Sequence, residues 1–365
     1  MDSVKIKDFR IYQYTLELAQ PLFVHQQELK NRSGLIIRLI SDTGTDEGFG
    51  EVAPLPGYSS ETLSESNEQI HFLKSKLTGQ TIPDQLTQFD GHFEHWLNPF
   101  NLKPSVRFGF ESAVLNLLAN SRHAPLYKLI PDARIHPIHI SGLLTGTVNQ
   151  ISERAKELLG LGFSELKLKV DNDIDDAIEK VLLINNIAYG KARLHLDANQ
   201  AWNFDQAVSF GKAIGCAAVS YIEEPFTDTS RIPEFFDQTL IPVALDETVQ
   251  DLSLEEIQAI SGVEILILKP TMLGGVEKTL QIMTQAENAA LDVVISSSFE
   301  SSLGIWTLAS IVETSAHNTA AGLDTLKWFK SDILKQPIHI HKGVINIDTR
   351  VVGPQDINFD LLSEL

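Results

Sequence analysis

Short apolar runs alternate with amphipathic runs from about residue 135 onward, at a spacing of roughly 25 residues, close to the ~30 residues per unit of a (β/α) barrel. The apolar runs resemble buried β-strands, and the runs between them have the apolar spacing of helices. The predicted strands are 135–143, 165–170, 193–199, 219–225, 241–247, 264–270, 292–298 and 319–324. The predicted helices are 149–162, 173–188, 203–215, 253–262, 274–291 and 301–316. Parallel strands joined by helical crossovers form a closed barrel or a doubly wound sheet, and the number of repeats favours the barrel.

The first hundred residues follow a shorter period. Polar and apolar residues alternate over 4–18 and 34–51, and Gly and Asp residues bound these runs, so we expect strands of an antiparallel sheet there. An amphipathic helix is expected over 61–77, with Ser59 or Ser60 as its N-cap. Together these elements predict a small α+β domain.

The tail alternates again between polar and apolar residues over 337–360, and we expect it to return to the first domain. No long Pro- or Ser-rich linker and no low-complexity stretch divides the chain. The predicted organisation is an α+β domain over 1–105, a (β/α) barrel over 106–325 and a C-terminal segment over 326–365.

The balance of charge excludes some partners. The chain carries 29 Lys and Arg against 48 Asp and Glu, a net charge of −19 with His neutral. This charge repels phosphate backbones, and no basic cluster offers a local exception, so we expect no nucleic-acid partner. The N-terminal residues lack the apolar core of a signal peptide, and no apolar run reaches the ~18 residues of a membrane span. We therefore expect a cytoplasmic protein without a membrane partner, and the sequence leaves its oligomeric state open.

Carboxylates follow three consecutive predicted strands of the barrel. Asp197 and Asn199 end the third strand, the glutamates 223–224 end the fourth, and residues 246–247, Asp-Glu, end the fifth. These strand ends meet where barrel active sites lie. Converging carboxylates repel one another unless a cation lies among them, and oxygen-only ligation selects a hard ion. We expect Mg²⁺ there, with Mn²⁺ as the alternative ion, rather than a set of separate helix caps.

Three lysines are expected to face the same cavity. Lys167 and Lys169 lie two residues apart on one predicted strand, so their side chains share a face while the intervening leucine points to the helices. Burial and mutual repulsion inside the barrel are expected to lower the ammonium pKa and to prepare one of them as a general base. Lys269 ends the sixth strand, nearly opposite the second.

The remaining polar and aromatic residues carry less weight. The serines 296–298 end the seventh predicted strand, where hydroxyl and backbone N–H groups suit a second carboxylate as well as they suit helix capping. His195 is expected to be a hydrogen-bonded core residue rather than a metal ligand. Cys216, the single cysteine, excludes an intrachain disulfide and a thiolate metal site, and we expect it to be buried and inert. Trp202 and Trp306 are expected to pack in the core.

A divalent ion with amines on two sides suits the removal of a proton next to a carboxylate, because the resulting dianionic enediolate needs positive charge to form. The runs KLK, DANQAW, IEEP, ALDE and LKP, which contain these residues, resemble those of the enolase superfamily, in particular its muconate-lactonizing-enzyme-like subgroup. The resemblance covers nearly the whole chain. It implies a modified (β/α)7β barrel of the TIM type with an N-terminal α+β capping domain that the C-terminal tail completes.

The resemblance also implies roles for individual residues. The implied metal ligands are Asp197, Glu223 and Asp246. The implied acid/base groups are Lys167 and Lys169 on one side of the cavity and Lys269 on the other.

The runs GEVAPLPGYSSETL, PSVRFGFESA, ISSSFESSLG and AGLDTLKWF are similar to those of the o-succinylbenzoate synthase family within that subgroup. These lyases dehydrate 2-succinyl-6-hydroxy-2,4-cyclohexadiene-1-carboxylate to 2-succinylbenzoate in menaquinone biosynthesis. The resemblance implies that Lys169 removes the proton and then helps hydroxide to leave, that Lys269 stabilises the enediolate, and that Lys167 assists Lys169. Loops 22–34 and 54–60 would close over the mouth of the barrel. The implied substrate contacts are Asn199, Ser296, Ser298 and Gly322.

Other activities remain open on the same scaffold. An N-acylamino acid racemase or a dipeptide epimerase would use Lys169 and Lys269 as bases on two faces. Dipeptide epimerases resemble one another in an Asp-x-Asp pair at the eighth strand, and this chain has Asp324 but Leu326, which counts against them. A non-catalytic binding protein on an enolase-type barrel would be expected to lack a ligand or a lysine, and none is missing.

Overall fold

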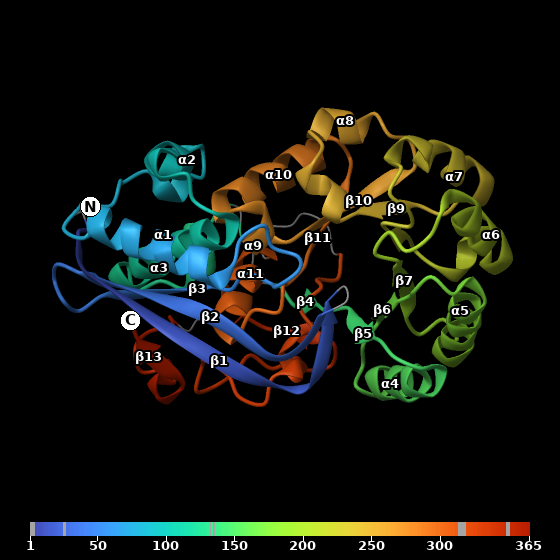
Figure 1. The fold of residues 1–365 in the computed structure, drawn as a ribbon, viewed down its shortest axis with the longest axis horizontal. Helices are drawn as coiled ribbons and strands as arrows, with labels where there is room; N and C mark the ends of the chain where they lie inside the picture. The colour runs from blue at the N-terminus through green and yellow to red at the C-terminus, as the bar shows by residue number, and fades with distance from the viewer. Residues whose placement is uncertain (1–3, 25–26, 132, 134–135, 313–318, 348–350) are drawn as a thin grey trace.

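The computed structural model describes residues 4–24, 27–131, 133, 136–312, 319–347 and 351–365. An antiparallel sheet with helices lies at one end and a ring of parallel strands lies at the other (Figure 1). The antiparallel sheet has the order β13-β1-β2-β3. Its strands are β1 (Ile6–Val24), β2 (Gln27–Ser41), β3 (Glu47–Val52) and β13 (Leu362–Glu364).

The hairpin of β1 and β2 is longer than the alternation predicts. Most of the predicted loop 22–34 is paired strand, and its residues 25–26 lie outside the described part of the chain. The pairing shifts register between Glu17 and Leu22, so a bulge separates the body of the hairpin from its tip. Pro21 lies in this bulge, where a missing N–H costs no ladder hydrogen bond.

Three helices accompany this sheet: α1 (Leu63–Leu77), α2 (His92–Leu97) and α3 (Pro104–Ser121). The N-cap of α1 is Thr62, which forms a capping box with Glu65, so the expectation of Ser59 or Ser60 is wrong. Ser59 instead accepts a hydrogen bond from the backbone N–H of Leu55. Ser59 and Ser60 lie in the turn before α1, and the capping box of Thr62 and Glu65 marks where the helix begins.

The helix α3 has no counterpart among the predicted helices because most of its circumference is buried, which removes the amphipathic period. It packs directly on β3, where glycines allow a close approach. A Cβ on Gly50 would lie 1.9 Å from the carbonyl oxygen of Gly109. Only glycine fits at this contact of sheet and helix.

Seven parallel strands form the barrel sheet in chain order, which confirms the predicted fold class. The strands are β5 (Gly142–Leu144), β6 (Glu165–Lys169), β7 (Arg193–Asp197), β8 (Ile222–Glu223), β9 (Val243–Leu245), β10 (Val263–Leu268) and β11 (Asp292–Ile295). The predicted eighth strand is reduced to parallel bridges from Ala321 to Ile140 and from Gly322 to Ser296. These bridges join the last strand of the sheet to the segment before the first.

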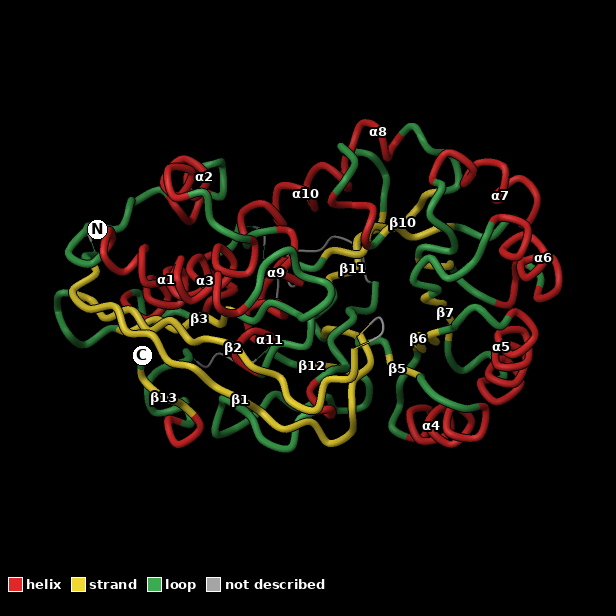
Figure 2. Tube along the Cα trace, in the orientation of Figure 1, coloured by secondary structure: helices red, strands yellow, loops and turns green. Residues whose placement is uncertain are grey.

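Helices cover the outer side of the barrel sheet (Figure 2). They are α4 (Val148–Gly160), α5 (Ile174–Ala188), α6 (Phe204–Ile214), α7 (Ile232–Thr239), α8 (Leu254–Gln258), α9 (Pro270–Leu273), α10 (Val276–Asn288) and α11 (Ser302–Val312). Two of them, α7 and α9, were not predicted. Residues 313–316 of the last predicted helix lie outside the described residues.

The tail contacts both parts of the molecule. Its strand β12 (Val344–Ile345) pairs with β4 (Ile138–His139), which takes up part of the predicted first strand. Its last strand, β13, pairs with β1 and so completes the antiparallel sheet, as expected. The domain boundaries given above stay a prediction.

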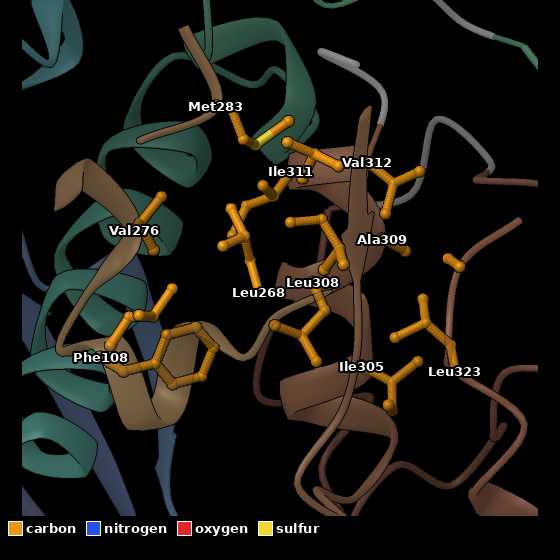
Figure 3. Close-up of a cluster of buried hydrophobic side chains, with 14 of the residues drawn as sticks. Phe108, Leu268, Val276, Met283, Ile305, Leu308, Ala309, Ile311, Val312 and Leu323 are labelled. Atoms are coloured by element: carbon orange, nitrogen blue, oxygen red, sulfur yellow. The ribbon is translucent and has the colours of Figure 1, made fainter. Parts of the chain in front are cut away.

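One hydrophobic core is shared between the two parts. Figure 3 shows Phe108 of α3 beside Val276 of α10 and Leu268 of β10, with the apolar face of α11 packed next to them. The sheet with its helices is thereby fixed on the barrel. None of the described helices combines the length and apolarity needed to cross a bilayer. The cytoplasmic location stays a prediction.

Candidate active site

The register of the barrel strands brings the predicted residues to one level. Lys169 of β6 pairs with Asp197 of β7, and Asp197 pairs with Glu223 of β8. Side chains at paired positions of parallel strands point to the same face of the sheet. The leucines that flank Lys167 are fully buried on the opposite face, against the helices.

Lysines and carboxylates alternate around the mouth. Lys167 Nζ lies 2.6 Å from Glu223 Oε2 and 3.1 Å from Asp197 Oδ2. Lys169 Nζ lies 3.0 Å from the same Asp197 oxygen. Lys269 Nζ lies 2.5 Å from Asp246 Oδ2. Ion pairs thus join four of the six predicted charged residues, and the pair of Lys269 and Asp246 lies near enough to interact electrostatically with Asp197 and Lys167.

The donor chemistry of this cluster fits a hard divalent cation. Asp197, Glu223 and Asp246 are each at most 6% exposed and offer only oxygen. Within the described ranges, no three His, Cys, Asp or Glu side chains stand close enough together to hold a metal ion in their present conformations. Lys167 instead lies between Asp197 and Glu223, and Lys269 pairs with Asp246, so ammonium groups compensate these carboxylates.

The carboxylate pKa values diverge with environment. Burial raises the pKa of Glu223 to about 8, against the opposing effect of Lys167. Burial also raises the pKa of Asp246. Although burial opposes it, the ammonium groups of Lys167 and Lys169 hold the pKa of Asp197 below its usual range. Asp197 is therefore the most firmly ionised of the three.

The expected lowering of the ammonium pKa is wrong for Lys167. Burial lowers the pKa of Lys167, but Asp197 and Glu223 outweigh burial and raise it well above its ordinary value. The pKa of Lys269 is likewise raised, because Asp246 outweighs burial. The lysines face carboxylates rather than one another. Lys169 is the most accessible of the three, with 40% of its side chain exposed.

Glu224 after β8 and Glu247 after β9, the second carboxylate at each of these strand ends, hold the loops around the site. Glu224 accepts hydrogen bonds at 2.9 Å from the backbone N–H groups of Asp246 and Thr248, so it holds the loop that carries Asp246. The φ of Glu224 is 42°, in the left-handed region, and this backbone conformation turns its side chain away from that of Glu223. Glu247 accepts from Tyr58 Oη at 3.0 Å. These contacts distinguish Glu224 and Glu247 from the residues that face the lysines.

Asn199 and Tyr58 connect the mouth to the capping sheet. Lys169 Nζ donates to Asn199 Oδ1 at 2.8 Å, and Asn199 Nδ2 donates to Tyr58 Oη at 3.0 Å. The Tyr58 ring lies 5.3 Å from Lys269 Nζ, within cation–π range. Sequence reasoning missed Tyr58 as a site residue, although it lies in loop 54–60, which was expected to cover the mouth.

The three serines after β11 have different environments. Ser296 Oγ donates a weak hydrogen bond to the carbonyl of Gly322 at 3.4 Å, and Ser297 shares a hydrogen bond with Thr325. Ser298 Oγ is buried without a partner among the described residues. The serines do not cap α11, because Glu51 receives the N–H groups of Ser301 and Gly304.

Arg32 joins the cap to the barrel and was also missed. It is 1% exposed, and its guanidinium donates to the carbonyls of Ala53 and Pro54, where the covering loop 54–60 begins. It also donates at 3.1 Å to the carbonyls of Ser298 and Phe299 after β11. A buried guanidinium with several acceptors fixes both loops to each other.

An apolar cluster lies over the mouth. It consists of hairpin-tip residues and barrel residues, with Tyr58, Leu143 and Phe299 packed against it. Its buried members are Leu18, Leu22, Val24, Leu29, Leu55 and Trp328. This cluster fixes the hairpin tip and loop 54–60 on the barrel residues Leu143 and Phe299.

The less prominent residues fall into two groups. His195 is 3% exposed, lies 3.1 Å from Ser141 Oγ through Nε2 and stacks on Tyr221, as expected of a core residue. Trp202 and Trp306 are buried, also as expected. Cys216 is exposed, so its expected burial is wrong. It begins a 3-10 turn at the surface rather than continuing the apolar helix before it.

Two families match different parts of the chain. Residues 150–351 match the family described as Enolase C-terminal domain-like, and residues 6–117 match the one described as MenC, N-terminal domain. With the parallel barrel and the antiparallel cap, these matches define an enzyme of the enolase superfamily.

Curated relatives cover almost the whole chain. A Yersinia enterocolitica protein named o-succinylbenzoate synthase is 30% identical over 93% of this chain and 96% of its own length. One of the same name from Aliivibrio salmonicida is 31% identical over 90% of this chain and 93% of its own length. The chain belongs to the o-succinylbenzoate synthase family.

Solved structures share the fold at lower identity. A dipeptide epimerase from Cytophaga hutchinsonii, complexed with Mg and a dipeptide, has a TM-score of 0.87 at 20% identity and covers 100% of this chain and 99% of its own. The muconate lactonizing enzyme from Pseudomonas fluorescens has a TM-score of 0.83 at 20% identity, with 95% of each chain covered. At such identities these neighbours establish the fold alone.

Proposed function

We propose that this chain dehydrates 2-succinyl-6-hydroxy-2,4-cyclohexadiene-1-carboxylate to 2-succinylbenzoate, a step of menaquinone biosynthesis. The observation that carries the proposal is the pair Lys169 and Lys269, which reach one carboxylate cluster from separate strands in a chain of this family. Amines beside a buried anionic cluster suit the removal of a proton next to a carboxylate. The relatives named above support the choice of substrate.

Asp197, Glu223 and Asp246 would hold the metal ion, Mg²⁺ or alternatively Mn²⁺. Their buried oxygen atoms suit such an ion, and the structural neighbour from C. hutchinsonii was crystallised with Mg. The ion would supply positive charge beside the ring carboxylate of the substrate. Lys167 and Lys269, which now compensate the carboxylates, would then be released toward the substrate.

Lys169 would act as the base. Its amine, which must be unprotonated, takes the proton from the ring carbon that bears the carboxylate. The resulting ammonium then returns that proton to the hydroxyl on the adjacent ring carbon, which leaves as water while the new double bond makes the ring aromatic. The 40% exposure of its side chain and its hydrogen bond to Asn199 support this role, because both leave Nζ directed toward the mouth.

Lys269 and Lys167 would support the same step. Lys269, packed near the Tyr58 ring, would stabilise the enediolate from the other side. Lys167, held between Asp197 and Glu223, would assist Lys169 through its charge. Further substrate contacts are proposed at Asn199, Ser296, Ser298 and Gly322.

An N-acylamino acid racemase activity is the second candidate. It is favoured by the amines of Lys169 and Lys269, which approach from two sides as two-base racemisation requires. A dipeptide epimerase is less well supported. Asp324 forms an ion pair with Lys327 and accepts a hydrogen bond from the backbone N–H of Leu143, so its carboxylate is already engaged.

A paired substrate assay distinguishes these activities. The purified chain with Mg²⁺ is given the cyclohexadiene carboxylate while the ultraviolet absorbance of 2-succinylbenzoate is followed. The same preparation is given N-succinylamino acids while optical rotation is followed. We expect rapid dehydration. Racemisation without dehydration would replace the proposed function by the second candidate.

A further inference from the structure

The amine of Lys169 lies beside two side-chain oxygens. Lys169 Nζ is 3.0 Å from Asp197 Oδ2 and donates to Asn199 Oδ1 at 2.8 Å. An unprotonated amine has two N–H groups and one lone pair. When both N–H groups are donated to these oxygens, the lone pair occupies the remaining position, where it can take a proton from a substrate. The acceptor on Asn199 therefore helps to set the direction in which Lys169 acts as a base.

The amide of Asn199 serves Lys169 in one orientation only, because its oxygen accepts and its nitrogen donates. Asn199 Nδ2 donates to Glu247 Oε1 at 3.2 Å and to Tyr58 Oη at 3.0 Å. A carboxylate accepts, and the N–H groups of a lysine donate, so Glu247 must face the nitrogen while Lys169 faces the oxygen. The position of Glu247 thus selects the orientation of the amide that Lys169 needs.

The backbone fixes Asn199 at this place. Its φ of 42° lies in the left-handed region, which asparagine adopts more readily than most residues. Its N–H bonds to Asp197 Oδ1 at 3.2 Å, and the N–H of Gln200 bonds to the carbonyl of Glu224 at 2.7 Å. These bonds hold the turn after β7, so the contact with Glu247 has mainly the rotation of the amide to determine.

The hydrogen bonds of the Glu247 carboxylate all go to this network within the described part of the chain. Its Oε1 accepts from Tyr58 Oη as well as from Asn199, whereas its Oε2 is buried without a partner among the described residues. The backbone of the loop after β9 is held by Glu224 instead. Glu247 also interacts electrostatically with Lys269, and a role through that contact would require its charge.

We propose that Glu247 is a positioning residue for the dehydration and that it acts through Asn199, whose amide it orients so that the lone pair of Lys169 faces the substrate. This inference rests on the proposed function. It requires the hydrogen-bond acceptor of Glu247 and not its charge. Tyr58 joins the covering loop 54–60 to the same network, because it donates to Glu247 and accepts from Asn199.

Glu247→Gln and Glu247→Leu separate the acceptor from the charge. Glu247→Gln keeps an oxygen that can accept from Asn199 and Tyr58, whereas Glu247→Leu removes acceptor and charge together. We expect Glu247→Gln to keep kcat within about threefold of wild type and Glu247→Leu to lower it about tenfold or more. The rates are measured well below the thermal midpoint of each variant. An equal loss of kcat in both variants would show that the charge acts directly and would overturn the proposal.

A double-mutant cycle with Asn199→Ala tests whether Glu247 acts through Asn199. If it does, adding Glu247→Leu to a chain that already carries Asn199→Ala should lower kcat by less than about twofold. Two losses that multiply would mean that Glu247 acts independently of Asn199, which contradicts the proposal. A wild type that fails to dehydrate the cyclohexadiene carboxylate argues against the proposed function. An active wild type with losses that multiply argues against this inference alone.

Two further readouts exclude other roles for Glu247. Calorimetry should give nearly the same Kd for 2-succinylbenzoate in Glu247→Leu and wild type, and a Kd that rises as much as kcat falls would assign Glu247 to substrate binding. The Mg²⁺ concentration for half-maximal activity should also stay unchanged, unlike that of Glu224→Gln, which alters the residue that holds the backbone of Asp246. A similar rise in Glu247→Leu would show an action through Asp246 and would overturn the proposal.

Discussion

At the scale of single residues, each lysine of the site is paired with a carboxylate. This charge compensation explains the arrangement of the six side chains better than the properties of each lysine alone do. Each lysine contacts a carboxylate that the resemblance assigns to the metal, so either an ammonium or a cation can balance the same oxygens. The sequence predicted these six side chains because strand alternation and strand-end position are local properties. It could not predict Tyr58, Arg32 or Trp328, whose contacts join segments far apart in the chain.

Lys169→Ala should remove turnover without unfolding the protein. The loss of a general base typically costs 10²–10⁴-fold in rate, and the partly exposed Lys169 carries little packing. The kcat for dehydration and the thermal midpoint test this expectation. Lys278→Ala, at an exposed position on α10, is the control and should change neither. Substantial turnover by Lys169→Ala would exclude Lys169 as the base.

Glu224→Gln should weaken the response to Mg²⁺. Glu224 holds the backbone of Asp246 and Thr248 through one oxygen, and residues that orient a metal ligand typically contribute 10–100-fold to metal affinity. The Mg²⁺ concentration that gives half-maximal activity should rise by about that factor. The conservative variant Glu224→Asp would shorten the side chain and leave the charge in place. An unchanged Mg²⁺ requirement in both variants would contradict this positioning role.

At the scale of elements, the sequence predicts the helices and strands whose apolar residues recur with a clear period. It misses those whose apolar residues show no such period. The barrel strands and α5 follow directly from alternation and apolar spacing. The helix α3 was missed because it is buried on most sides, and the eighth strand shrinks to two bridges because its partners are set by barrel closure. The hairpin tip was taken for a loop, although its strands continue beyond a bulge.

Arg32→Met should loosen the connection between the cap and the loop after β11. The variant leaves several buried carbonyls without a donor, and each such group costs about 1–3 kcal/mol. The free energy of unfolding from denaturant titration should fall by at least ~2 kcal/mol. Arg10→Met is the control, because its ion pair with Asp8 is about 40% exposed and contributes little. Equal stability of the two variants would contradict the role assigned to Arg32.

At the scale of the whole molecule, buried charges also join the cap to the barrel. Glu111 of α3 is fully buried, pairs with Arg107 and accepts from the backbone N–H of Glu277 in α10. Burial raises the pKa of Glu111 to about 7 from its ordinary value of 4.5. The folded protein therefore binds a proton more tightly than the unfolded chain does.

Stability should accordingly fall as the pH rises. A raised carboxyl pKa contributes stability that is fully present below about pH 4.5 and is lost as the pH passes about 7. The shift corresponds to roughly 3 kcal/mol at most. Glu111→Gln cannot ionise, so unfolding measured between pH 5 and pH 8 should show a smaller decline in the variant than in the wild type. Parallel curves would contradict the raised pKa.

The central claim is that three buried carboxylates hold a divalent cation that the lysines need for dehydration. The most direct test is the rate of 2-succinylbenzoate formation by chain stripped with EDTA and then supplied with Mg²⁺. We predict negligible formation after stripping and full recovery with Mg²⁺, and no recovery in Asp197→Ala. A stripped protein that retains its rate, or an Asp197→Ala variant that recovers with Mg²⁺, would contradict the account.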